Sequence, residues 1–100
     1  MAVGILQMLQ GGTKEQYDQV NEAMFGQSPP SPDQVPEGLI IHSAGPTDDG
    51  WYIYDIWESK EQFEHFGQDK VGPAVREVTG SEMGGPPPQF FEIADLVQPA

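Results

Sequence analysis

The stretch Gly38–Phe66, GLIIHSAGPTDDGWYIYDIWESKEQFEHF, decides the fold of this chain. Two of its segments, Gly38–Ala44 and Trp51–Trp57, are rich in β-branched and aromatic residues, and the polar turn GPTDDG joins them, so they predict an antiparallel hairpin. Ser59 then has the side chain of a helix N-cap, with a glutamine three residues later, and a helix is expected to begin at Lys60. The stretch therefore predicts strand, strand and helix in that order.

A strand and a helix are expected before this stretch. Ala2–Leu9 is a short apolar run that ends at two glycines, which is typical of a strand. Thr13 is a second N-cap, and the helix that it starts is expected to run over 14–25 with Tyr17 and Met24 on its inward stripe.

Two connections and a last strand complete the chain. The segment 27–37 carries four prolines and is a loop, either a rigid connector or a lid over a site. Gly67 and the pair Gly72-Pro73 are expected to interrupt the second helix, with the proline starting another short helical piece. A flexible connection then leads to the last strand, expected over Gln89–Val97.

The expected element order is β-α-β-β-α-β, within a single domain that spans residues 1–100. This is the ferredoxin-like α+β arrangement, in which both helices cover one face of a four-stranded antiparallel sheet. The opposite face of such a sheet is bare. Three of the four strands carry apolar residues at both odd and even positions, and therefore on both faces of the sheet. We therefore expect two copies to pack sheet against sheet as a homodimer.

The composition limits the partners and the chemistry. Sixteen acidic and four basic residues give a formal net charge of −12, which argues against binding to nucleic acid or to an anionic membrane. There is no cysteine, the two histidines match no metal-ligand spacing, and no cofactor motif is present, so neither a metal nor a cofactor is expected. The first residues resemble neither a signal peptide nor a membrane span, and we expect a cytoplasmic protein. A small hydrophobic or aromatic ligand and a second copy remain as partners.

The segment YDIWESKEQFEHF is similar to the strand-to-helix signature of the dimeric α+β barrel superfamily, and the later VGPAV resembles the second half of the same helix. That superfamily includes the antibiotic-biosynthesis monooxygenase-like proteins and the stress-responsive barrel proteins. The resemblance implies a homodimeric barrel with an apolar pocket. In the monooxygenase-like branch it also implies cofactor-free oxygenation or polyketide cyclisation of aromatic metabolites.

The resemblance does not extend to the histidine of the monooxygenase-like branch. That histidine commonly lies nine residues beyond the signature aromatic, a place that Phe66 holds here, counting from Trp57. His65 is one residue earlier, and one residue turns a side chain by about 100° around a helix. We therefore expect His65 on the solvent side, and the heme-degrading branch, which needs a helical histidine ligand, is disfavoured for the same reason.

His42 is the candidate general base, because it lies within a strand and histidine titrates near neutral pH. Its neighbours depend on the register of the hairpin. In one register His42 faces Tyr54; with the pairing slipped by one residue it faces Ile53 and lies diagonal to Asp55, whose carboxylate would orient the ring. The alternative is a histidine that is only hydrogen-bonded within a half-buried sheet.

Other side chains complete the candidate site. The Tyr17 hydroxyl can stabilise a developing oxyanion, or the ring can belong to the core with a wet tip. Five apolar side chains wall an aromatic-binding cavity or simply fill the core: Trp57, Phe63, Phe66, Met24 and Phe25. We expect a small-molecule pocket protein in which His42 abstracts a proton and Asp55 or Tyr54 orients it. A non-catalytic ligand-binding or stress-associated barrel protein is the alternative.

Overall fold

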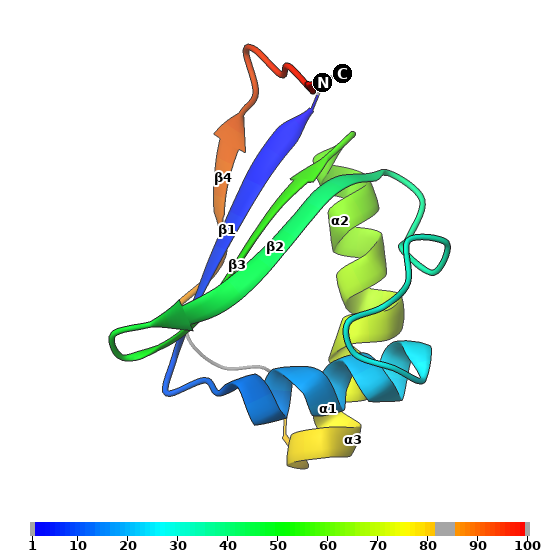
Figure 1. Ribbon diagram of the computed structural model, residues 1–100, viewed down its shortest axis with the longest axis vertical. Coiled ribbons are helices and arrows are strands. Elements are labelled where there is room, and N and C mark those ends of the chain that lie inside the picture. Colours follow the sequence, from blue (N-terminus) through cyan, green and yellow to red (C-terminus); the bar gives the residue numbers. More distant parts are fainter. Residues whose placement is uncertain (1, 82–85, 100) are drawn as a thin grey trace.

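The structure, a computed structural model, describes residues 2–81 and 86–99. Its elements are β1 (Val3–Gln10), α1 (Lys14–Phe25), β2 (Leu39–Thr47), β3 (Gly50–Trp57), α2 (Lys60–Phe66), the π-helical segment η1 (Gly67–Val71), α3 (Gly72–Thr79) and β4 (Gln89–Glu92). They form one antiparallel four-stranded sheet in the order β2-β3-β1-β4. The helices lie on one side of it (Figure 1). The ferredoxin-like α+β fold predicted from the sequence is confirmed.

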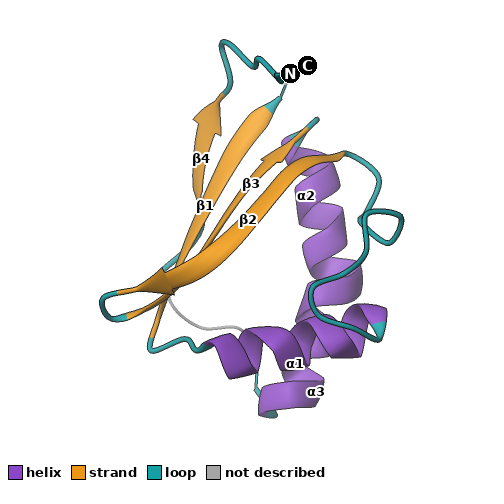
Figure 2. Ribbon diagram, in the orientation of Figure 1, coloured by secondary structure: helices purple, strands orange, loops and turns teal. Residues whose placement is uncertain are grey.

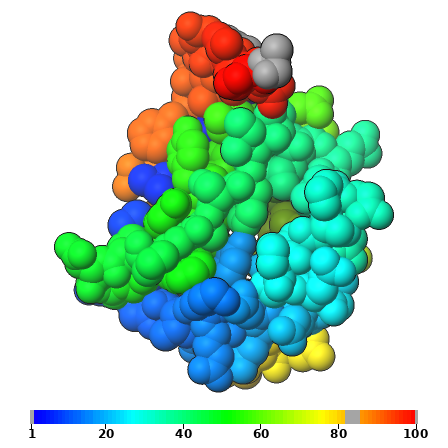
Figure 3. Space-filling model, viewed as in Figure 1, coloured from blue at the N-terminus to red at the C-terminus, as the bar shows by residue number. Residues whose placement is uncertain are grey.

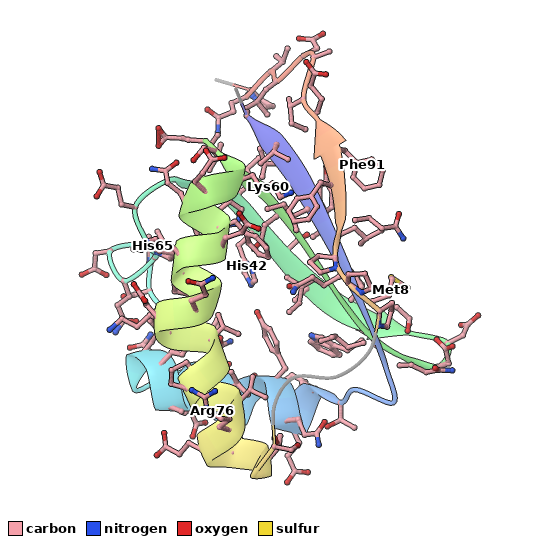
Figure 4. All side chains as sticks on the ribbon, turned by 180° about the vertical axis from the view of Figure 1, so that it is seen from behind. Met8, His42, Lys60, His65, Arg76 and Phe91 are labelled. Atoms are coloured by element: carbon pink, nitrogen blue, oxygen red, sulfur yellow. The ribbon has the colours of Figure 1, made fainter. Side chains whose placement is uncertain are left out.

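The two faces of the sheet have different surroundings (Figure 2). One face looks toward the helices and carries Ile5 and Trp57, the two most deeply buried large side chains of the described residues. The other face, called the open face below, exposes Met8, Ile41 and Phe91 by 41%, 40% and 44%. In Figure 4, His42 lies between sheet and helices, whereas Met8 and Phe91 lie on the far side of the sheet.

Both predicted helix N-caps are confirmed. The side chains of Thr13 and Ser59 accept hydrogen bonds from the backbone N–H groups three residues later, and both caps have extended backbone angles. Gly26 ends α1 in the left-handed region, with φ of 79°, which glycine adopts without a steric penalty. Local sequence signals therefore place the starts of both helices and the end of the first.

The hairpin is longer than expected, and neither predicted register is correct. β2 continues to Thr47 and β3 already begins at Gly50. The turn between them therefore consists of two residues rather than the whole GPTDDG segment. His42 lies directly opposite Asp55, so the pairing slips by one residue in the direction that was not considered. Because paired residues of an antiparallel ladder point to the same face, His42 and Asp55 are neighbours on the helix side.

A β-bulge in β2 changes which side chains face the helices. Leu39 lies opposite Trp57 and Ile41 opposite Ile56, so Ile40 is an extra residue between two consecutive pairs. In an unbroken strand, positions 39 and 42 would point to opposite faces because the side-chain period is two. With the extra residue, both point toward the helices.

Two other predictions need correction. The second helix is not interrupted at its glycines: α2 continues through η1 into α3, and the N–H of Gly72 donates to the carbonyl of Gly67 in the wider π pattern. Pro73 lies in the first turn of α3, directly after the π-helical turn, so the proline begins this helical piece as expected. The last strand ends at Glu92 rather than at Val97, because only four of its residues pair with β1.

Candidate functional site

A pocket of about 890 Å³ lies between the sheet and the helices. Most of its lining is apolar or aromatic, and the loop after α1 forms part of its wall through Pro30, Val35 and Pro36. Ser28 ties this loop to α1, because its hydroxyl donates to Asp18 at 2.6 Å. Figure 3 shows the surface hollowed between β2, in green, and α1 with the following loop, in blue and cyan.

Three elements bring a carboxylate, an imidazole and a phenol together in this pocket. Asp55 Oδ1 on β3 lies 2.7 Å from His42 Nδ1 on β2, and the Tyr17 hydroxyl on α1 lies 2.5 Å from His42 Nε2. We call these three side chains the Asp55–His42–Tyr17 network. All three line the pocket.

The hydrogen bonds define the proton positions within the network. An ionised carboxylate only accepts, so a neutral His42 ring carries its proton on Nδ1 and donates it to Asp55. Nε2 then accepts from the Tyr17 hydroxyl. The second carboxylate oxygen accepts from the indole N–H of Trp57 at 3.2 Å, so both oxygens of Asp55, which is only 8% exposed, have partners. These two hydrogen bonds offset the free-energy cost of burying the Asp55 carboxylate.

The pKa of Tyr17 is raised above its usual value near 10.0, chiefly because burial disfavours the phenolate. A hydrogen bond from the Asn21 side chain opposes this shift, and the nearby carboxylates of Asp55 and Asp18 add to it. Tyr17 therefore remains a protonated hydrogen-bond donor at neutral pH.

The side chains expected to bind a ligand all line the pocket. The Trp57 ring contacts Phe63 edge-on at 5.9 Å and lies 5.7 Å from Phe66, and Phe66 stacks on Phe25 at 6.4 Å between ring centroids. Met24 lines the same wall. These contacts form an aromatic surface beside the Asp55–His42–Tyr17 network, and their role in binding stays a prediction.

Two residues lie where they cannot join this site. Tyr54 is on the open face, where a Cβ added at Gly4 would come within 2.6 Å of its hydroxyl, so the prediction that Tyr54 orients His42 is wrong. His65 is exposed on the outer side of α2, 3.2 Å from Asp69 (Figure 4). The expectation that His65 faces solvent is confirmed.

Two pocket residues had no assigned role in the sequence-based reading. Trp51 is 7% exposed, its ring lies 5.2 Å from that of Tyr17, and its indole nitrogen has no hydrogen-bond partner among the described residues. Asn21 is buried on α1 and donates to Ser28 at 3.1 Å. The period of two from Asp55 back to Trp51 is the sequence signal that places Trp51 on the pocket side.

Among residues 2–81 and 86–99, no group of three or more histidine, aspartate and glutamate side chains is arranged to hold a metal ion. Within the same ranges, no helix combines the length and the apolar character that crossing a bilayer requires.

No family model and no curated protein matches the chain. Among solved structures, the chain is similar to a monooxygenase from the gene ActVA-Orf6 of Streptomyces coelicolor, whose crystal structure contains the ligand Nanaomycin D. The two share 20% sequence identity with a TM-score of 0.54, over 99% of this chain and 92% of that chain. At this identity the likeness shows a shared fold, the ferredoxin-like α+β arrangement.

Proposed function

We propose that this protein binds a hydrophobic or aromatic metabolite in the pocket and acts on it by general acid–base chemistry, using its own side chains and no cofactor. The observation that carries the proposal is the Asp55–His42–Tyr17 network, which opens onto an aromatic-lined cavity of about 890 Å³. The fold similarity to a monooxygenase crystallised with Nanaomycin D supports the same class of ligand.

The geometry favours Tyr17 as the group that contacts the substrate. Both ring nitrogens of His42 already have partners, so a substrate proton can reach His42 only through the Tyr17 hydroxyl. As the substrate proton moves to the phenol oxygen, the phenol proton moves to Nε2, and the imidazolium that forms is stabilised by Asp55. The products of this step are an enolate or phenolate of the substrate and a neutral Tyr17. Such an anion is the species that cyclisation, or oxygenation by dioxygen, requires.

A non-catalytic binding protein is the second candidate, and one observation favours it. The saturated hydrogen bonding of His42 is also what a purely structural histidine shows. In that case the pocket and its ligand class are unchanged and no proton transfer follows.

Turnover of a defined probe separates these functions. Anthrone, a tricyclic ketone with an enolisable CH₂ group, is incubated with the protein in air and followed by absorbance. We expect His42→Ala and Tyr17→Phe to lower kcat by about 10²- to 10⁴-fold, the usual contribution of general acid–base catalysis. His65→Ala, which changes an exposed histidine, is the matched control and should leave kcat unchanged. Full activity in a folded His42→Ala variant would refute the mechanism; binding without turnover in the parent protein supports the second candidate.

We propose further that a second copy of the chain covers the open face. Met8 on β1, Ile41 on β2 and Phe91 on β4 are exposed there, spread across the sheet from β2 at one edge to β4 at the other, and an exposed apolar patch of this kind marks an interaction surface. The helix side, with the pocket, stays outside this contact.

A further inference from the structure

The charged groups around the pocket are almost all acidic. Its titratable lining residues are Tyr17, His42, Asp55 and Glu64. All four lysine and arginine residues of the sequence lie in the described part of the chain, and none of them lines the pocket: Lys14, Lys60, Lys70 and Arg76. The wall therefore offers no permanent cation to a bound anion.

A ligand carboxylate would meet an unfavourable environment in this pocket. It would lose water on entry, and the nearest fixed charge at the sheet is the buried carboxylate of Asp55, whose partner His42 is already engaged. Glu64 adds a second acidic group on the helix side. The formal charge of −12 on the whole chain opposes the approach of an anion as well.

Two hydrogen-bond donors in the pocket, the Trp51 indole N–H and the Tyr17 hydroxyl, are suited to an uncharged ligand oxygen. The indole N–H of Trp51 is buried in the pocket wall without a partner among the described residues, and such a donor is costly unless an acceptor arrives. The Tyr17 ring, 5.2 Å away, carries the hydroxyl at the pocket end of the network. A carbonyl oxygen is an acceptor that needs no counter-charge.

We propose that the pocket selects an uncharged aromatic ketone, whose carbonyl oxygen accepts from the Trp51 N–H, and excludes carboxylate-bearing analogues of the same size. This selection rests on the proposed function, because it assumes that the pocket is the ligand site. Asp55 is the residue that sets the charge preference, and Trp51 is the residue that recognises the carbonyl.

Calorimetric titration at pH 7 with anthraquinone-2-carboxylate and its methyl ester tests the charge preference. We expect the ester to bind at least about tenfold more tightly, since an unpaired charge entering the pocket loses its hydration. Asp55→Asn should narrow this ratio, and Asp69→Asn, which removes the same formal charge from an exposed side chain of η1, should not. If Asp55→Asn does not fold, as judged by circular dichroism, Glu64→Gln should narrow the ratio in its place. Equal affinities of the parent protein for acid and ester would overturn the proposal.

Trp51→Phe tests the carbonyl contact, because it removes the N–H and keeps an aromatic ring. The variant should bind anthraquinone about five- to a hundredfold more weakly, as expected for one buried hydrogen bond, and bind anthracene, which lacks oxygen, as the parent does. An equal loss for both probes would overturn the role of Trp51. Failure of every probe to bind the parent protein would instead remove the proposed function, and with it this selection.

Discussion

At the scale of single residues, Asp55 is the side chain around which the site is arranged. It is the one charged residue of a strand that is otherwise apolar and aromatic, GWYIYDIW, and it is buried. Its two oxygens accept from His42 and Trp57, so the carboxylate holds an imidazole on one side and an indole on the other. This explains how an acidic residue is accommodated within the sheet.

The two tryptophans make a matched pair for measuring this arrangement. Trp57→Phe removes an indole N–H that donates to the Asp55 carboxylate, whereas Trp51→Phe removes one without a partner among the described residues. Hydrogen bonds to charged groups contribute roughly 1.5–3 kcal/mol, so Trp57→Phe should lower the free energy of unfolding by about 2 kcal/mol more than Trp51→Phe does. Urea unfolding followed by circular dichroism measures both. Equal losses would mean that the Trp57–Asp55 bond contributes nothing to stability.

The ionisation of Tyr17 provides a second test at this scale. Its pKa is raised in the folded protein, mainly by burial, so the phenol of the unfolded chain ionises first, near pH 10.0. The stabilisation linked to Tyr17 is therefore complete below about pH 10 and is lost as the pH rises through the folded pKa. Subtracting the ultraviolet titration of Tyr17→Phe from that of the parent isolates this phenol. A midpoint at or below pH 10 would contradict the buried, hydrogen-bonded placement.

At the scale of elements, the helical run α2, η1 and α3 passes two glycines and a proline without ending. Gly67 has helical angles, with φ of −59°, and a Cβ added there would meet nothing within 4 Å. A Cβ added at Gly26 would likewise meet nothing, but its φ is 79°. The two glycines therefore differ in backbone conformation and not in the space around them.

The same substitution should have opposite effects at these two positions. Gly67→Ala should stabilise the protein by about 0.5–1 kcal/mol, because alanine loses less backbone entropy in a helix. Gly26→Ala should destabilise it by about 1 kcal/mol, because a side chain is strained in the left-handed region. Melting temperatures of the two variants, compared with the parent, check the signs. Destabilisation by Gly67→Ala would indicate that the π-helical segment requires a glycine.

The features of the fold and the site that could be predicted from the sequence are those encoded by residues close together in the chain. The helix starts follow from Thr13 and Ser59, each of which interacts with a residue three positions away, and these predictions are confirmed. The pairing of His42 with Asp55 was missed, because it is set by a two-residue turn that carries no distinct sequence mark. Tyr54 was consequently placed on the wrong face.

At the scale of the whole molecule, the sheet separates the pocket from the apolar open face. The helix side contains the pocket, and the open face exposes Met8, Ile41 and Phe91. Because the sheet lies between them, assembly through the open face leaves the pocket accessible (Figure 1).

Phe91→Glu tests the proposed assembly. A charge at this exposed apolar position should convert a dimer into a monomer, because a desolvated carboxylate at the contact has no partner. Size-exclusion chromatography with light scattering should show the mass fall from twice 11.0 kDa to that value. Gln19→Glu adds the same charge on exposed α1 and should leave the dimer intact. A parent protein of 11.0 kDa at every concentration tested would refute the assembly.

The bulge at Ile40 and the π-helical segment Gly67–Val71 have a shared consequence for how the chain tolerates changes in its length. The bulge adds one residue to a strand, and the π-helical segment adds one residue to a helical turn. The bulge borders the pocket through Leu39 and His42, and the π-helical segment borders it through Phe66 and Val71. Because the pairing and the helix direction resume beyond each surplus residue, losing it restores regular geometry without turning the flanking side chains away from the pocket. Single-residue deletions at these two places are therefore expected to alter the pocket outline and to keep the fold.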